Sequence, residues 1–136
     1  PRIAVCALNP HAGEGGILGG EEAALIQPAI RKAKKRKIRA YGPFAADSLF
    51  QFALDGPFDA YISMYHDQGL IPFKMVAQKR GVNVTIGLPV IRTSVDHGVA
   101  YDIAGRGDAD AASMQAAYRL AEKLAMIRTK KLPTAK

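Results

Sequence analysis

The sequence predicts an α/β fold in which a largely parallel sheet is flanked by helices in three layers. Short apolar runs alternate at close spacing with segments of helical periodicity, and this alternation is typical of proteins with parallel sheets. The chain has 136 residues, of which 49% are hydrophobic and 23% are charged. Such a composition supports a buried core and excludes an intrinsically disordered chain. We find no internal repeat and no linker that would divide the chain in two.

The first strand is predicted at residues 2–8 (RIAVCAL), a short apolar run that precedes a glycine-rich segment at residues 9–20. A helix is predicted from Glu21 to about Lys35, because glutamates occupy its first turn, where the helix dipole favours negative charge. Pro28 is expected to kink this helix or to mark its true start. Its predicted inner face consists of Ile26, Ala29, Ile30 and Ala33.

The middle of the chain continues the alternation. Its predicted elements are a strand at residues 38–41, a turn at Gly42-Pro43, a short helix at residues 45–54 and a strand at residues 58–64. Residues 67–79 are expected to be irregular or partly helical around Pro72.

The last third is predicted to contain a strand at residues 82–86 (VNVTI), which is rich in β-branched residues, and a loop at residues 87–96. A helix is expected at residues 109–126, followed by a basic, disordered tail at residues 128–136. The predicted inner face of this helix consists of Ala112, Ala116, Leu120, Lys123 and Leu124.

The net charge of +7 comes from one segment. Residues 31–39 contain seven of the 19 basic residues and no acidic one, and the remaining 12 basic residues balance the 12 acidic ones. Nucleic-acid-binding proteins usually spread such charge over a face that also carries aromatic side chains. We therefore interpret residues 31–39 as a solvated helix end and loop, with a basic binding module for an acidic partner as the alternative.

Cysteine content and hydropathy exclude several further classes of protein. The single cysteine, Cys6, excludes a disulfide framework and a multi-cysteine zinc site, and its place in a predicted strand indicates a buried small hydrophobic residue. No apolar run approaches the roughly 20 residues of a membrane span. The first apolar run is too short for a signal peptide. A cytoplasmic location is therefore expected.

Histidines lie where α/β proteins place their sites. His11 and His66 each follow a predicted strand, and ligands bind beyond the carboxyl ends of parallel strands. Neutral imidazole binds divalent metals, and carboxylates often complete the ligand set. Asp47 and Asp67 are the nearest candidates, although a helix cap and a turn residue are the respective alternatives. A third ligand has to come from elsewhere.

Other polar residues suggest an anion site. Lys74, Asn83 and Arg92 are single donors in apolar surroundings, which suits a clamp for a carboxylate or phosphate. For Arg92 an internal ion pair is the alternative. The glycine-rich segment at residues 12–20 ends at a helix start, so an anion-binding loop and an ordinary flexible loop both remain open. A hydrolase triad is not expected, because its only candidates are too close together in sequence, namely Ser94, Asp96 and His97.

Four motifs occur in a characteristic order: NPHAGEGG, GPFAADSLF, MYHDQGLIPFK and GVNVTIGLPVIRTSVDHGVAYDIAGRG. Together they resemble the 4-hydroxythreonine-4-phosphate dehydrogenase family, from Pro1 to about Met126. The resemblance implies a fold like that of isopropylmalate dehydrogenase, of which this chain is only a part. Residues 1–127 are then the C-terminal catalytic and nucleotide-binding portion of a cytoplasmic homodimer, whose active site lies between the subunits.

The same resemblance implies an NAD- or NADP-dependent oxidation, with decarboxylation, of 4-phosphooxy-threonine in pyridoxal phosphate biosynthesis. A divalent ion (zinc, magnesium or cobalt) is implied to be held by His11 and His66, with Asp47 as a further candidate. The third histidine ligand lies in the N-terminal part that this chain lacks. The partner molecule is a small phosphorylated hydroxy-amino acid, and no nucleic acid or membrane is expected.

Roles for other residues follow from the resemblance too. Lys74, Asn83 and Arg92 match the substrate-binding residues of the family, and Asp67 and Lys74 are the candidates for catalysis. The stretch HGVAYDIAG is similar to the adenosine-binding loop of isopropylmalate and isocitrate dehydrogenases. That similarity implies a cofactor site formed by His97, Gly98, Ala100 and Asp102. The alternatives are a relative acting on another four-carbon acid phosphate or an aromatic cis-dihydrodiol, and a non-catalytic truncated remnant.

Overall fold

The structure, a computed structural model, describes the backbone of residues 1–131 and the side chains of residues 1–128. The chain forms two compact units, which comprise Pro1–Phe73 and the residues from Lys74 onward. The boundary falls inside helix α3 (His66–Ala77) and not in a loop, so no change in composition marks it in the sequence.

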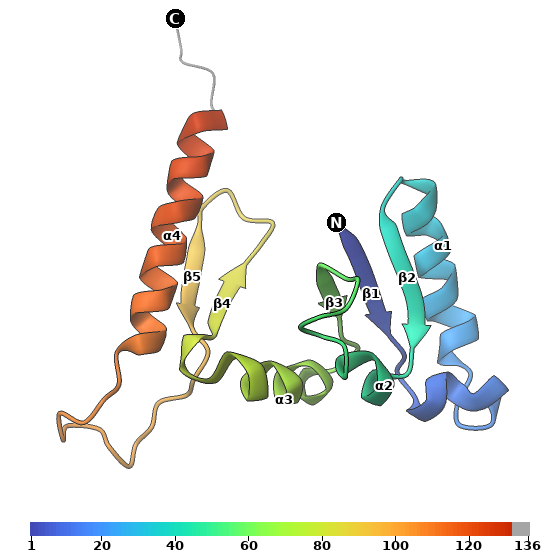
Figure 1. The fold of residues 1–136 in the computed structure, drawn as a ribbon, viewed down its shortest axis with the longest axis horizontal. Coiled ribbons are helices and arrows are strands. Elements are labelled where there is room, and N and C mark those ends of the chain that lie inside the picture. Colours follow the sequence, from blue (N-terminus) through green and yellow to red (C-terminus); the bar gives the residue numbers. More distant parts are fainter. Residues whose placement is uncertain (132–136) are drawn as a thin grey trace, which may run out of the picture. The chain divides into compact units, whose positions relative to one another are not determined.

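The first unit contains a parallel sheet of three strands, as predicted (Figure 1). The strands are β1 (Arg2–Cys6), β2 (Arg39–Phe44) and β3 (Ala60–Ile62), and their order across the sheet is β2-β1-β3. The first strand of the sequence therefore lies in the middle of the sheet. Both of its edges are paired, and both of its faces are covered, which explains its continuous apolar sequence.

Helices cover both faces of this sheet, which gives the predicted three layers. On one face Val5 packs with Ile26 and Ile30. On the other face Ala4 and Cys6 pack with Leu49, which belongs to α2 (Ala46–Phe50). Burial raises the pKa of the Cys6 thiol, as expected for a residue of the core and not for a nucleophile.

The helix predicted at residues 21–35 is present, and Pro28 explains its form. It begins with a π-helical turn at Glu22–Ile26 and continues as α1 (Gln27–Lys35). Proline cannot donate a backbone hydrogen bond, and it lies here at the start of the regular α-helix, where such a bond is not needed. The prediction that Pro28 marks the start of the helix is thus confirmed for the α-helical part. Of the predicted inner face, Ala29 is exposed.

The turn predicted at Gly42-Pro43 was wrong, because both residues lie within β2. Proline is tolerated there since β2 is an edge strand, which has one unpaired side. Gly42 has a φ of 127°, and a Cβ at this position would collide with the backbone oxygen of Val5. The pairing of β1 with β2 shifts its register between Ala4 and Cys6, so glycine serves a bulge here and not a turn.

Helix α2 is shorter than predicted, and Asp47 does not cap it. Asp47 lies inside the first turn, and the N-cap position is occupied by Ala45, which makes no side-chain capping bond. The Asp47 carboxylate is exposed and contacts the hydroxyl of Ser48 at 3.5 Å.

The second unit departs further from the prediction. Helix α3 runs without interruption across Pro72, where we expected the chain to be irregular or partly helical, and a short 3-10 turn follows at Gln78–Arg80. An antiparallel hairpin comes next, formed by β4 (Val82–Thr85) and β5 (Arg92–Val95). The strand β5 lies in the predicted loop at residues 87–96. Its sequence, RTSV, is too short and polar to be recognised without its partner strand.

Helix α4 (Ala112–Lys131) packs against this hairpin. Ser113 and Ala117 are its buried residues, whereas the predicted inner-face residue Lys123 is exposed. The helix extends beyond its predicted end and includes the first residues of the expected tail at 128–136. Residues 132–136 lie outside the described part of the chain. None of the described helices has the length and apolar character needed to cross a membrane.

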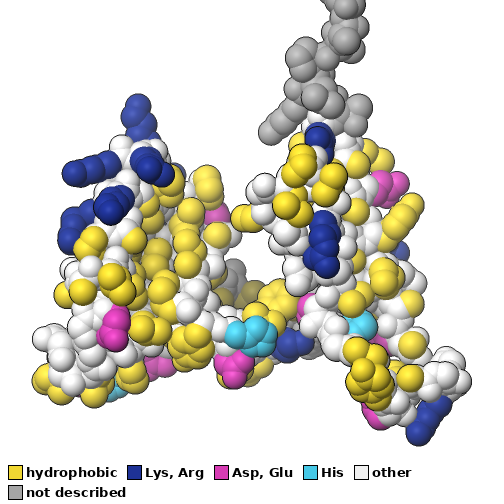
Figure 2. Space-filling view, turned by 180° about the vertical axis from the view of Figure 1, so that it is seen from behind, with side chains coloured by type: hydrophobic (Ala, Val, Ile, Leu, Met, Phe, Trp, Pro, Cys, Tyr) yellow, Lys and Arg dark blue, Asp and Glu magenta, His cyan; other side chains and the backbone are white. Residues whose placement is uncertain are grey.

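The basic stretch at residues 31–39 covers the end of α1, the following turn and the first residue of β2. Its basic side chains are exposed and gather at one end of the first unit (Figure 2). Lysines in the last turn of a helix interact favourably with the helix dipole. This placement agrees with our interpretation of a solvated helix end and loop.

Candidate active site

The loop that carries His11 is not an ordinary flexible loop. After β1 the chain forms a helical turn at Pro10–Gly16 in which five consecutive residues have φ between 44° and 81°. Three of these residues are not glycine, namely His11, Ala12 and Glu14. Left-handed backbone costs about 1–2 kcal/mol for each such residue. It persists only where surrounding contacts impose it, and such strain is concentrated at functional sites.

The contact that holds this loop is the buried carboxylate of Glu22, which is 4% exposed. Its Oε1 accepts hydrogen bonds from the backbone amides of Leu8 and Asn9, both at 2.8 Å. Its Oε2 accepts a third from the side-chain amide of Asn9 at 3.1 Å. The hydrogen bond from the backbone amide of Asn9 is the main cause of the lowered pKa of Glu22. An internal carboxylate, and not an external anion, therefore satisfies these two amides.

Glycine is required where the loop closes on Glu22. A Cβ on Gly13 would lie 2.7 Å from Glu22 Oε2, and a Cβ on Gly19 would collide with the side chain of Asn9. The sequence showed the glycines but not the residues that they approach, because Glu22 and Asn9 meet them only in the folded chain.

The second histidine loop is held by Gln68. The strand β3 ends at Ile62, and α3 begins with His66. Gln68 is 8% exposed; its Oε1 accepts a hydrogen bond from the amide of Met64 at 2.7 Å. Its Nε2 donates to the carbonyl oxygen of Ala7, also at 2.7 Å. Because β1 and β3 are adjacent and parallel, both histidines follow strand ends at the same edge of the sheet, as predicted.

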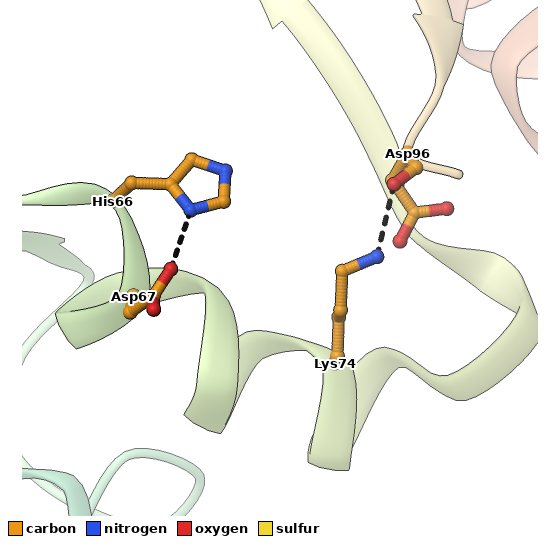
Figure 3. A network of polar contacts seen from close by, with 4 residues as sticks. All are labelled: His66, Asp67, Lys74 and Asp96. Atoms are coloured by element: carbon orange, nitrogen blue, oxygen red, sulfur yellow. Dashed lines mark hydrogen bonds and ion pairs between the residues drawn. The ribbon is translucent and has the colours of Figure 1, made fainter. Parts of the chain in front are cut away.

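Each imidazole has a carboxylate beside its Nδ1 atom. His66 Nδ1 lies 2.7 Å from Asp67 Oδ1 (Figure 3), and His11 Nδ1 lies 3.6 Å from Glu14 Oε2. Metal-binding histidines commonly use such a carboxylate to hold the Nδ1 proton, which leaves Nε2 as the ligand atom. Both side chains are largely exposed. The donor set thus suits a divalent ion, and Asp67 is placed to orient His66.

The described residues do not complete a metal site by themselves. Within residues 1–128 no group of three or more His, Cys, Asp or Glu side chains is arranged to hold a metal ion. Asp47, His11 and His66 thus do not form such a group among the described residues, and the candidacy of Asp47 stays a prediction. The expectation that a third ligand comes from outside this chain stays a prediction, as does the convergence of His11 and His66 on one ion.

In the second unit, Lys74 lines a pocket of about 250 Å³. Its Nζ donates to the carbonyl oxygen of Asp96 at 3.0 Å (Figure 3). The other lining residues are Gln78, Lys79, Asp96, His97, Asp110 and Ser113. A predicted substrate-binding residue and a predicted cofactor-binding residue, Lys74 and His97, thus share one pocket. The other residues predicted for the cofactor are exposed and do not line it, namely Gly98, Ala100 and Asp102.

Asn83 and Arg92 lie on the same face of the hairpin. The register pairs Asn83 with Ser94 and Thr85 with Arg92, and residues two apart in a strand share a face. Arg92 is exposed, and its guanidinium donates to Thr85 Oγ1 at 3.0 Å. Among the side chains of residues 1–128, Arg92 forms no ion pair with an internal acid, which was the alternative for it. Lys74 and Arg92 line different pockets of this unit, and the shared cradle of Lys74, Asn83 and Arg92 stays a prediction.

Sequence reasoning missed three residues that organise these sites. Glu22 and Gln68 hold the two histidine loops, and Thr85 contacts Arg92. Gln68 had a signal, since it follows His66 and Asp67 directly in the same motif. For Thr85 and Glu22, no pattern in the neighbouring sequence indicates such a role.

Comparison with known proteins agrees with the four motifs. The family model described as "Pyridoxal phosphate biosynthetic protein PdxA" matches residues 1–121. The chain belongs to the PdxA family. A 4-hydroxythreonine-4-phosphate dehydrogenase of Geobacter metallireducens is 59% identical to this PdxA chain over 128 residues. That alignment covers 94% of the chain but 38% of the relative, so the chain spans less than half the length of such proteins.

Solved structures show the same relationship. The crystal structure of 4-hydroxythreonine-4-phosphate dehydrogenase from Klebsiella pneumoniae matches this PdxA chain with a TM-score of 0.78 and 46% identity. The match covers 89% of the chain and 37% of that protein. A terephthalate 1,2-cis-dihydrodiol dehydrogenase from Burkholderia xenovorans matches with a TM-score of 0.66 and 38% identity, over 89% of the chain and 38% of that protein. The predicted α/β fold and the family resemblance are thereby confirmed.

Proposed function

We propose that this chain is the C-terminal portion of a 4-hydroxythreonine-4-phosphate dehydrogenase. In this proposal the complete protein oxidises and decarboxylates 4-phosphooxy-threonine with NAD or NADP, as a homodimer. The identity to relatives of that name supports the substrate class. The observation that carries the proposal is the pair of exposed imidazoles at one sheet edge, each with a carboxylate at Nδ1.

His11 and His66 hold the divalent ion through their Nε2 atoms in this proposal, and a further histidine comes from outside the chain. When bound, such an ion acts as a Lewis acid that lowers the pKa of the substrate hydroxyl and stabilises the charge left by loss of carbon dioxide. Asp67 keeps the Nδ1 proton of His66 in place, which fixes the orientation of the ring.

The cationic and amide side chains of the second unit bind the substrate. Arg92 has its guanidinium exposed and positioned by Thr85, which suits bidentate contact with a phosphate or carboxylate. Asn83 adds an amide donor on the same face of the hairpin. Lys74 supplies a second positive charge to an anionic group. The loop from His97 to Asp102 is assigned to the nicotinamide cofactor by family resemblance.

A second candidate substrate is an aromatic cis-dihydrodiol. The likeness to the terephthalate cis-dihydrodiol dehydrogenase favours it, because a terephthalate dihydrodiol carries carboxylates that Arg92 and Lys74 also suit. The identity to that protein, 38%, is lower than the 46% to the 4-hydroxythreonine-4-phosphate dehydrogenase from Klebsiella pneumoniae. Assays of the complete protein with both substrates decide between the two.

The metal site is tested by His11→Ala and His66→Ala in the complete enzyme. Each change removes one of the proposed ligands, so we expect the purified protein to lose its bound metal, as measured by elemental analysis. His97→Ala is the matched control. His97 is assigned to the cofactor and not to the metal, so its replacement should leave the metal content unchanged. Unchanged metal content in both of the first two variants would overturn the ligand assignment.

A further inference from the structure

The side chain of Gln68 joins the two histidine-bearing loops. It lies two residues after His66 in the first half of α3 and is buried, whereas His66 and Asp67 are exposed. Both ends of its amide are used, since Oε1 accepts from Met64 N and Nε2 donates to Ala7 O, each at 2.7 Å. One partner precedes His66 by two residues, and the other precedes His11 by four.

The contacts of Gln68 lie just beyond the end of the pairing between β1 and β3. The pairing of β1 with β3 ends at Val5 and Ile62; β3 stops there, and β1 continues only to Cys6. Beyond the last β1–β3 pair, the side-chain amide of Gln68 connects the backbone of Ala7 to that of Met64. Directly after it, the amides of Leu8 and Asn9 are held by Glu22. Three consecutive residues before the turn that carries His11 are thus fixed by two buried side chains.

The chemistry at this position requires an amide. The Ala7 carbonyl needs a donor and the Met64 amide needs an acceptor, and a glutamine side chain offers one of each. A carboxylate in its place would put an oxygen against the Ala7 oxygen. A methionine of similar length would leave both backbone groups without partners.

From these contacts we infer that Gln68 is a positioning residue that sets the separation of His11 and His66 for a shared divalent ion. The inference rests on the proposed function, in which both imidazoles are ligands. Gln68 itself contacts backbone groups of the protein and acts through the two histidines. Its loss should therefore weaken metal binding more than it weakens the fold.

The test uses the 136-residue chain and Zn²⁺ alone, with the histidine ring signals followed by NMR during titration. In the unaltered chain we expect the His11 and His66 rings to respond at the same Zn²⁺ concentration, with His97 unaffected. In Gln68→Glu and Gln68→Met we expect the two rings to respond at different concentrations, with affinity lower by about 10–100-fold, as for other residues that orient metal ligands. The methionine variant adds no charge, so it separates the lost bridge from electrostatic effects.

Leu49→Val is the matched control, since Leu49 is buried and packs with Ala4 and Cys6 of β1, not with the residues that Gln68 bridges. It should lower the midpoint of thermal unfolding and leave the Zn²⁺ response unchanged. Equal Zn²⁺ affinity in the unaltered chain and both Gln68 variants overturns the positioning role and leaves the proposed metal site intact. Independent responses of His11 and His66 in the unaltered chain overturn the shared site itself, and the inference with it.

Discussion

Glu22 is a buried acid whose role becomes visible only through its partners. Glu22 is one of two glutamates at the start of a predicted helix, and from the sequence we expected it to interact favourably with the helix dipole. In the structure it instead accepts hydrogen bonds from the chain just beyond β1. The distance along the sequence between these partners, more than a dozen residues, explains why local patterns do not reveal the contact.

Glu22→Gln should reduce stability at neutral pH and flatten its dependence on pH. The pKa of Glu22 is lowered in the folded protein, mainly by the hydrogen bond from the backbone amide of Asn9. A carboxyl of this kind stabilises the fold fully above its unfolded pKa, about 4.3. That stabilisation is lost as the pH falls through the lowered folded pKa. The difference in free energy of unfolding between the two proteins should thus be largest at pH 7 and shrink below pH about 4.

Urea unfolding at a series of pH values measures this difference. Glu122→Gln, an exposed residue of α4, is the control and should show no such trend. A difference that stays constant from neutral to acidic pH would contradict the role assigned to the ionised Glu22.

At the scale of elements, three prolines show what local propensity does and does not decide. Pro28 and Pro72 are compatible with helices, the first at the start of α1 and the second inside α3. Pro43 lies in an edge strand. Sequence propensity predicted a kink or start at Pro28, which is confirmed, a turn at Pro43, which was wrong, and irregular or partly helical chain around Pro72, where the helix is continuous. On either side of Pro72, Gln68 and Lys74 donate side-chain hydrogen bonds to backbone oxygens outside the helix.

Ser113 fastens α4 to the hairpin, and its removal should destabilise the second unit. Its buried hydroxyl lies 3.0 Å from the carbonyl oxygen of Gly81 and 3.2 Å from Asp96 Oδ1. Ser113→Ala removes the hydroxyl that these two oxygen atoms face. We therefore expect a loss of about 1–3 kcal/mol in the free energy of unfolding. Urea denaturation measures it. Ser48→Ala, at an exposed position, should change stability by less than about 0.5 kcal/mol, and equal losses would refute the assigned contact.

At the scale of the whole molecule, the chain covers 38% of a relative that is 59% identical to it. Its described residues offer two imidazoles for a metal and no complete ligand group. The reaction that we propose therefore requires the portion of the enzyme that relatives carry in addition.

Joining this chain to the remaining portion of the Geobacter relative should produce a dehydrogenase, whereas the chain alone should show no activity. In our proposal only the joined protein contains the further metal ligand and the rest of the active site. Formation of NADH or NADPH with 4-phosphooxy-threonine, followed by absorbance, measures the outcome. The same fusion carrying His66→Ala is the control and should be inactive. Activity of the 136-residue chain by itself would contradict the need for an external ligand.

The sequence by itself determined the family, the parallel sheet of the first unit and the residue types of the site. These depend on local properties: apolar runs, glycine-rich turns, and motifs such as NPHAGEGG and MYHDQGLIPFK that lie within single segments. The predicted histidines and the candidate residues Asn83 and Arg92 are of this kind.

Only the tertiary structure decided how those residues are held. The strand β5 exists because β4 pairs with it, and the division into two units falls inside a helix. Gln68 and Glu22 matter because folding brings Ala7, Leu8 and Asn9 to them. Buried polar groups must find partners wherever the backbone leaves them, and those partners are set by distance in space and not by distance along the chain.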